Sequence, residues 1–150
     1  MSNKYNNGPF PLFCDDLRPS NVLVDENLRI CAVIDWEFCY AAPAEFSHCS
    51  PWWLLLARPE TWNAGIDDFL AHYMPRQKIF LEVLRDCENE LNQNGSIFGS
   101  PRLSELMAQS IEDGSFWVSL AAIYSFAFDD IYWQFIHPKH YGQSRLLRTW

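Results

Sequence analysis

One stretch, residues 13–37, constrains the fold of this 150-residue chain more than any other. Residues 22–24 and 30–34 are short apolar, largely β-branched runs, and acidic and amide residues typical of turns separate them. This pattern predicts a β-hairpin. Because antiparallel pairing brings the two ends of a hairpin together, Asn21 and Asp35 are expected to meet at its base.

The same stretch carries residues suited to phosphoryl transfer, which needs positioning and charge neutralisation more than covalent chemistry. Asp16 precedes Asn21 by five residues. In kinase catalytic loops an aspartate and an asparagine at this spacing take the substrate proton and hold magnesium. We therefore identify Asp16 and Arg18 as candidate catalytic residues, with Arg18 facing the γ-phosphate. Asn21 and Asp35 supply the oxygen ligands that magnesium prefers and are the candidate residues for binding the magnesium nucleotide.

A simpler interpretation makes Asp16 and Asn21 turn residues and Asp35 a helix N-cap. An aspartate five residues before an asparagine is common by itself. The order of strand, loop, hairpin, apolar strand and Asp-Trp-Glu is more specific, and it favours the catalytic interpretation.

Residues 12–46 resemble the core of the aminoglycoside phosphotransferase and choline kinase family, whose fold is similar to that of protein kinases. The family loop reads His-Gly-Asp-[Leu/Ile/Phe]-x3-Asn, followed by Ile-Asp-[Trp/Phe]-Glu. The resemblance implies that Asp16 is the catalytic base and that Asn21 and Asp35 bind Mg²⁺. It makes Glu37 a second acid that helps to hold the metal. It also implies transfer of the γ-phosphoryl group of ATP to a hydroxyl of a small acceptor.

Two positions depart from the family loop. Cys14 stands where the family has a histidine that braces the loop, and Asp15 stands where it has glycine. The first change puts the rigidity of the loop in doubt, and the second adds a negative charge beside Asp16.

Beyond residue 50 the patterns are helical. Helix starts are expected at Ser50-Pro51, Ile66, Ser100-Pro101 and Phe116, and breaks at Pro75, Asp129-Asp130 and Pro138. The charged residues between Arg76 and Glu88 predict a solvated helix face. The fold class is therefore α+β and mostly α-helical. The resemblance makes residues 11–150 the C-terminal lobe of a protein-kinase-like fold, in which a small β-hairpin carries the catalytic loop, after a polar tail at residues 1–10.

The composition indicates which binding partners and which cellular compartment to expect. With 11 basic and 19 acidic residues the net charge is −8, which argues against nucleic-acid binding and is compatible with a cationic acceptor. The apolar stretch at 116–128 is too short to span a membrane, and the N-terminus lacks a signal-peptide core. Five cysteines at irregular spacing predict buried free thiols in a reducing cytoplasm.

Only fifteen residues precede Asp16, without the Gly-rich loop and strand lysine of a nucleotide-binding lobe. We therefore expect a fragment or truncated member of a small-molecule phosphotransferase family, inactive or weak as this chain alone. The surface left by the missing lobe is expected to cause self-association. Three alternatives stay open: a non-catalytic kinase-like interaction module, an unrelated helical scaffold with a chance motif, and a thiol enzyme that uses Cys14.

Overall fold

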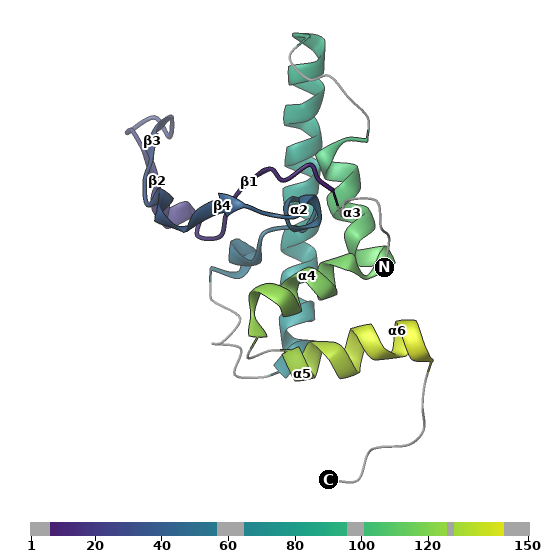
Figure 1. Ribbon diagram of the computed structural model, residues 1–150. Coiled ribbons are helices and arrows are strands. Elements are labelled where there is room, and N and C mark those ends of the chain that lie inside the picture. Colours follow the sequence, from purple (N-terminus) through teal and green to yellow (C-terminus); the bar gives the residue numbers. More distant parts are fainter. Residues whose placement is uncertain (1–6, 57–64, 96–100, 126–127, 143–150) are drawn as a thin grey trace. The chain divides into compact units, whose positions relative to one another are not determined.

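The computed structural model describes residues 7–56, 65–95, 101–125 and 128–142 (Figure 1). The chain divides into two compact units, Met1–Ser47 and His48–Trp150. The first unit holds the strands and the second holds the long helices. No helix among the described residues has the length and the apolar character needed to cross a membrane.

The first unit contains two separate two-stranded antiparallel sheets. Strand β2 (Val22–Val24) pairs with β3 (Ile30–Val33), so the predicted hairpin is confirmed. Strand β1 (Leu12–Cys14) pairs with β4 (Cys39–Ala41), a strand that the sequence did not predict. In Figure 1 the β2–β3 pair lies next to the β1–β4 pair along the ribbon of the first unit. Three short helices complete the unit: η1 (Pro19–Asn21), η2 (Trp36–Phe38) and α1 (Ala44–Ser47).

The hairpin turn closes on one side chain. Asp25 Oδ1 accepts hydrogen bonds from the backbone N–H groups of Asn27 at 2.8 Å and Arg29 at 2.9 Å. Leu28 between them has φ 60°, a left-handed conformation that is uncommon for a residue with a branched side chain. An aspartate that bonds its own turn explains why this polar cluster ends one strand and starts the next.

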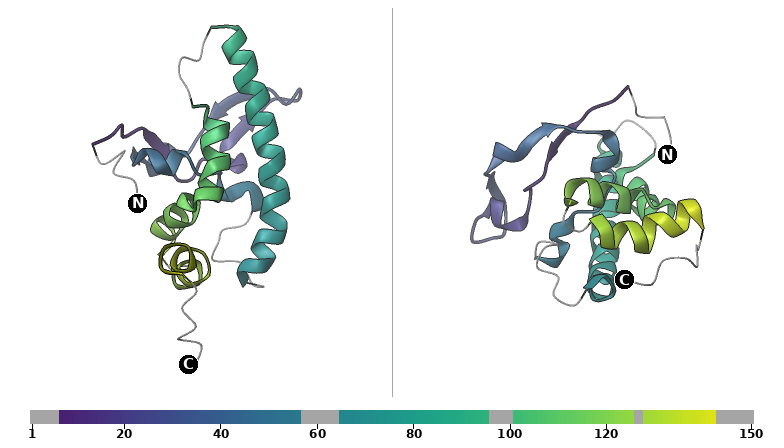
Figure 2. Two further views of the ribbon diagram at one scale, coloured as in Figure 1. Left: turned by 90° about the vertical axis from the view of Figure 1, so that its right-hand side faces the viewer. Right: turned by 60° about the horizontal axis from the view of Figure 1, so that its bottom comes forward.

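The second unit is helical. It contains the 3-10 helix η3 (Trp52–Leu55), α2 (Gly65–Gln93), α3 (Leu103–Asp113) and α4 (Ser115–Ile123). Its last described segment runs through α5 (Phe128–Ile131), the π-helix η6 (Tyr132–Ile136) and α6 (His137–Tyr141). Helix α3 lies beside the long helix α2 in both views of Figure 2.

An aromatic core joins these helices. The rings of Phe69 and Tyr73 on α2 stack at 4.8 Å between centroids, and Phe116 on α4 lies 5.6 Å from Tyr73. Trp117 on α4 stacks on Phe135 of η6 at 3.8 Å. Burial of one such side chain contributes about 1.5–3 kcal/mol, so this cluster holds the second unit together.

Three predicted helix breaks were wrong. Pro75 lies inside the continuous helix α2, because the buried residues Phe69, Tyr73 and Gln77 form one face that spans it. Asp129 and Asp130 begin α5 instead of breaking a helix, since carboxylates stabilise a first turn through the helix dipole.

Pro138 does not end helix formation either. It stands at the start of α6, directly after the wider turns of η6, where a missing backbone N–H costs little. The apolar helix α4 itself ends earlier than its composition suggested, at Ile123.

Two predicted starts also differ. The predicted helix at Ser50-Pro51 exists as η3, but Pro51 is its N-cap residue. Ser50 instead accepts hydrogen bonds on its hydroxyl from Gln77 and on its carbonyl from Tyr73. Helix α3 begins at Leu103, and Ser100 lies outside the described residues, as does the side chain of Ile66.

Two burial predictions were wrong as well. Glu88, expected on a solvated face, is buried because its carboxylate accepts hydrogen bonds from the backbone N–H and the hydroxyl of Ser104 at the start of α3. The five cysteines are free thiols, but none is fully buried, and Cys31 and Cys87 are exposed. Cys31 on β3 and Cys87 on α2 lie on the solvent-facing sides of these elements.

Candidate active site

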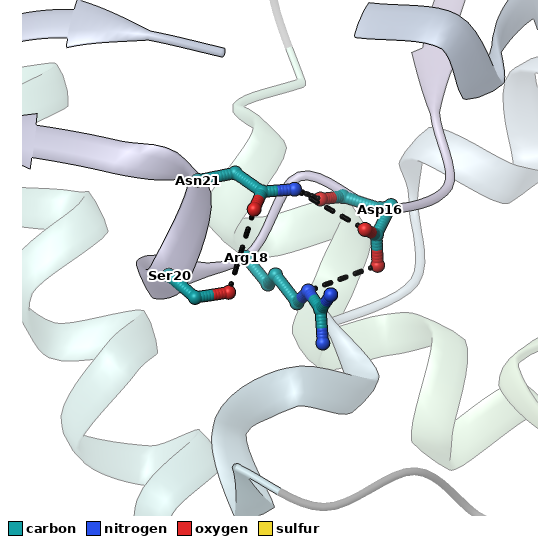
Figure 3. Close-up of polar contacts among 4 residues, drawn as sticks. All are labelled: Asp16, Arg18, Ser20 and Asn21. Carbon is teal, nitrogen blue, oxygen red and sulfur yellow. Dashed lines mark hydrogen bonds and ion pairs between the residues drawn. The ribbon is translucent and has the colours of Figure 1, made fainter. Parts of the chain in front are cut away.

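The loop between β1 and β2 is closed by Asn21. Its Nδ2 donates to the backbone carbonyl of Asp16 at 2.9 Å and to Asp16 Oδ2 at 3.2 Å (Figure 3). Its backbone N–H donates to the carbonyl of Arg18 at 2.9 Å. Asn21 is buried, with 4% of its surface exposed, so these bonds are shielded from water. The five-residue spacing thus places an aspartate and an asparagine side chain in direct contact.

Arg18 reaches back to the other oxygen of Asp16. Its Nε lies 3.1 Å from Asp16 Oδ1 (Figure 3), and the contact is an ion pair rather than an aligned hydrogen bond. The Arg18 side chain is 36% exposed, and that of Asp16 is 13% exposed. Both carboxylate oxygens of Asp16 therefore have a partner inside the loop, one from a neutral amide and one from a partly exposed cation.

The hairpin brings its second end back to Asn21. The backbone N–H of Ile34 donates to the carbonyl of Asn21 at 2.9 Å, which puts Asp35 one residue beyond the contact. Asp35 is exposed and has φ 61° and ψ 52°, a left-handed conformation. That conformation turns the chain sharply out of β3 and into η2, where Glu37 is also exposed. Trp36 Nε1 anchors the turn by donating to the carbonyl of Val33 at 2.8 Å.

The simpler interpretation, in which Asp16 and Asn21 are turn residues and Asp35 is a helix N-cap, holds only in part. Asp35 does occupy the N-cap position of η2, but its side chain makes no capping hydrogen bond. Asp16 and Asn21 do lie in a turn, and they bond to each other. A capping role therefore leaves the Asp35 carboxylate without an explanation.

The donor chemistry around the hairpin base fits magnesium. Asn21 Oδ1 accepts one long hydrogen bond, from the Ser20 hydroxyl at 3.5 Å, whereas Nδ2 makes the shorter bonds to Asp16. An amide oxygen and the carboxylates of Asp35 and Glu37 are hard oxygen ligands of the kind magnesium takes, with water and phosphate oxygens completing the shell. Within the described ranges, no three His, Cys, Asp or Glu side chains form a ready-made metal cluster.

The β1–β4 ladder holds the first residues of the loop. The backbone N–H of Asp15 donates to the carbonyl of Phe38 at 3.2 Å. The ring of Phe13 makes edge contacts with Tyr40 at 5.8 Å and Phe46 at 5.7 Å. Burial, with a smaller contribution from the negative Asp15, raises the pKa of Tyr40. Backbone pairing and aromatic packing thus brace the loop where Cys14 replaces the family histidine.

Sequence reasoning missed this ladder. The only signal was the short aromatic run Phe38-Cys39-Tyr40 before Pro43, which has strand propensity but no adjacent turn to fix a partner.

A sequence model of the phosphotransferase enzyme family matches residues 9–90, which include the whole loop and hairpin. The chain belongs to this family. The resemblance to the aminoglycoside phosphotransferases drawn from the loop motif is confirmed at that level. No curated protein and no solved structure matches the chain significantly.

Proposed function

We propose that this phosphotransferase family member transfers the γ-phosphoryl group of ATP to a hydroxyl of a small acceptor, in the cytoplasm, and that residues 11–150 form a kinase-like C-terminal lobe. The observation that carries the proposal is the pair of contacts from Asn21 Nδ2 to Asp16. They fix a carboxylate next to an amide whose oxygen remains available. The acidic net charge is compatible with a cationic acceptor.

Asp16 acts as the base in this proposal. One of its carboxylate oxygens takes the proton of the acceptor hydroxyl as the hydroxyl oxygen bonds to the γ-phosphorus. The bond from that phosphorus to the β–γ bridging oxygen breaks, and ADP leaves with the electron pair. Because the transition state of phosphoryl transfer is loose, the main task of the carboxylate is to be correctly positioned.

Arg18 takes two positions in the proposed reaction, one before and one after the nucleotide binds. Without substrate it pairs with Asp16 Oδ1. In the proposed reaction its partly exposed side chain turns toward the γ-phosphate, where a guanidinium binds phosphate oxygens in a bidentate manner. That movement frees Oδ1 for the acceptor hydroxyl. Arg18 thus keeps the base neutralised until a phosphate competes for the cation.

Magnesium, when bound, neutralises charge on the phosphate oxygens. Asn21 and Asp35 would hold it, with Glu37 as a further acid acting directly or through water. Asn21 suits this position because its amide nitrogen is already committed to the loop.

A second candidate function is a non-catalytic kinase-like interaction module. The observation that favours it is that both oxygens of Asp16 already have partners, while Cys14 and Asp15 replace the usual histidine and glycine. In this alternative the loop is a structural turn and nucleotide binding is absent.

Magnesium-dependent ATP binding separates the two. Calorimetric titration of the chain with ATP is carried out with and without Mg²⁺, using Asp35→Asn beside the wild type. Asparagine also tolerates the left-handed backbone, so the variant removes the charge without straining the turn. Glu26→Gln, in the exposed hairpin turn, is the control with the same change of charge.

The phosphotransferase proposal expects Asp35→Asn to abolish the magnesium-dependent part of binding and Glu26→Gln to keep it. Unchanged binding by Asp35→Asn would remove the assigned metal role. Absence of magnesium-dependent binding in the wild type would favour the interaction module. Asp16→Asn is expected to bind Mg-ATP normally and lose phosphoryl transfer, since an asparagine oxygen still accepts from Asn21.

A further inference from the structure

Cys14 and Cys39 face each other across the β1–β4 ladder. A backbone hydrogen bond lies on each side of this pair. One residue away, the N–H of Asp15 donates to the carbonyl of Phe38; three residues away on the other side, the N–H of Ala42 donates to the carbonyl of Pro11. In an antiparallel ladder, hydrogen-bonded and non-hydrogen-bonded pairs alternate. Counting inward from these two bonds makes Cys14 and Cys39 a non-hydrogen-bonded pair, the type in which facing side chains approach most closely.

That position suits a disulfide. The Cα atoms of a non-hydrogen-bonded pair lie about 4.5 Å apart, at the short end of the range that disulfides span. Both thiols are free and half-buried. Bond formation therefore needs side-chain rotation and little movement of the backbone.

We propose that Cys14 and Cys39 are a redox-active dithiol, which a small-molecule disulfide such as oxidised glutathione converts into an intrachain disulfide at the entrance of the catalytic loop. One thiolate of the pair attacks one sulfur of the small disulfide and releases a thiol. The other then attacks the protein sulfur of this mixed disulfide and releases the second thiol. Two protein thiols are thus oxidised, the small disulfide is reduced to two thiols, and the two protons pass to the departing thiolates.

Either thiol of the facing pair can react first, and the ladder holds the other thiol opposite it as the resolving group. Thiol–disulfide exchange runs in both directions, so an excess of the reduced small thiol restores the dithiol.

The cross-link would act on the loop next to it. Cys14 is two residues before Asp16, and Cys39 is two residues after Glu37. A bond between them ties the chain that enters the loop to the chain that leaves the hairpin base. The dithiol itself is independent of the proposed phosphotransferase function, and only its value as a control of catalysis depends on that function.

The other thiols provide matched controls. Cys31 and Cys87 are exposed, and Cys31 lies on β3, where no cysteine faces it. Single exposed thiols form mixed disulfides but cannot close a ring within the chain. Cys31→Ser and Cys87→Ser should therefore leave the proposed bond intact.

The test uses the whole chain, first reduced and then equilibrated with buffers of varied ratio of reduced to oxidised glutathione. Acid quenching, alkylation and mass spectrometry then locate the bonds. The proposal expects a monomer two hydrogens lighter, and a peptide pair linking Cys14 to Cys39 in the wild type and both control variants. Cys14→Ser and Cys39→Ser should give a glutathione adduct and no linked pair.

Hydrogen exchange of the oxidised chain gives a second readout. Closing this ring stabilises the first unit, so the amides of Asp15 and Ala42 should exchange at least about tenfold more slowly. Stable glutathione adducts on both wild-type cysteines, or bonds formed only between chains, would overturn the proposal. A linked pair in a chain that fails to bind Mg-ATP would instead uphold the dithiol and count against the phosphotransferase function alone.

Discussion

Asn21 has the largest structural effect expected of any residue in the loop, because one buried amide makes both contacts to Asp16. Asn21→Ala removes two hydrogen bonds and leaves the Asp16 carbonyl without its donor. We expect the free energy of unfolding of the first unit to fall by about 1–3 kcal/mol. Trp36 is the only tryptophan in residues 1–47, so exchange of the Ile34 amide together with Trp36 fluorescence would report the loss.

Asn27→Ala is the control for this change, since the exposed Asn27 uses its backbone in the turn. Equal effects of the two substitutions would mean that the loop does not depend on the Asn21 amide.

Tyr73 makes the stability of the second unit depend on alkaline pH. Burial raises the pKa of its phenol far above the ordinary value, with a further contribution from Cys49. The folded state thus holds the proton more tightly than the unfolded state. The resulting stabilisation is complete below the unfolded pKa of about 10 and is lost as the pH rises through the folded pKa. Urea unfolding above about pH 10 should show stability falling by up to about 1.4 kcal/mol per pH unit.

Tyr73→Phe should remove that dependence and cost about 1–2 kcal/mol at neutral pH, because the carbonyl of Ser50 loses its donor. Tyr132→Phe is the matched control and should keep the alkaline slope. A slope that survives in Tyr73→Phe would assign it to other groups.

Residue-level prediction from sequence succeeded where partners are close in the chain. The Asp16–Asn21 contact spans five residues, and the approach of Asn21 to the Asp35 segment follows from a local hairpin. It failed for Glu88, whose partner Ser104 lies sixteen residues away across a helix connection. A charged side chain that caps a neighbouring helix looks, in sequence, the same as one on a solvated face.

Among the elements, α2 carries an unfavourable proline in its interior. Pro75 is exposed, lacks the N–H of a helical residue and crowds the preceding turn. Pro75→Ala should raise the free energy of unfolding of the second unit by about 1–3 kcal/mol. Thermal or urea unfolding followed by circular dichroism would measure the gain. A loss of stability would show that the helix needs the proline for its packing.

The strand elements show why only part of the fold was predictable. The turn of the β2–β3 hairpin is recognisable in the sequence, because its polar residues include Asp25, which accepts hydrogen bonds from two backbone N–H groups. The β1–β4 ladder pairs residues that are 25 residues apart at Cys14 and Cys39 and further apart at the other pairs, and no tight turn joins the two strands. Its register depends on the conformation of the whole loop and hairpin between the two strands, which no local sequence pattern specifies.

At the scale of the whole molecule, the two units differ in how much apolar surface they bury. The second contains the aromatic core of Phe69, Tyr73, Phe116 and their neighbours. In the described part of the first unit, the fully buried apolar residues are Ala42 and Ala44. Small residues contribute little hydrophobic free energy, so the first unit depends more on its hydrogen bonds than on a core.

The first unit also exposes many large apolar side chains, and from them we predict self-association. Leu28 is 82% exposed, Ile30 71% and Leu12 69%. The net charge of −8 opposes association, so it should strengthen with protein concentration and with salt, which screens the repulsion. Leu28→Asn with Ile30→Thr removes apolar surface from the hairpin while suiting the left-handed turn and the strand.

Sedimentation and light scattering over a range of concentrations, at low and high salt, would test this. The wild type should show a rising average mass, and the double variant should stay closer to the monomer. Ile79→Thr, which removes a similarly exposed residue from α2, is the control and should associate like the wild type. A wild-type monomer at every concentration and salt would mean that the exposed residues are covered within the chain itself. Association reduced equally by Ile79→Thr would place the contact on the helices rather than on the hairpin.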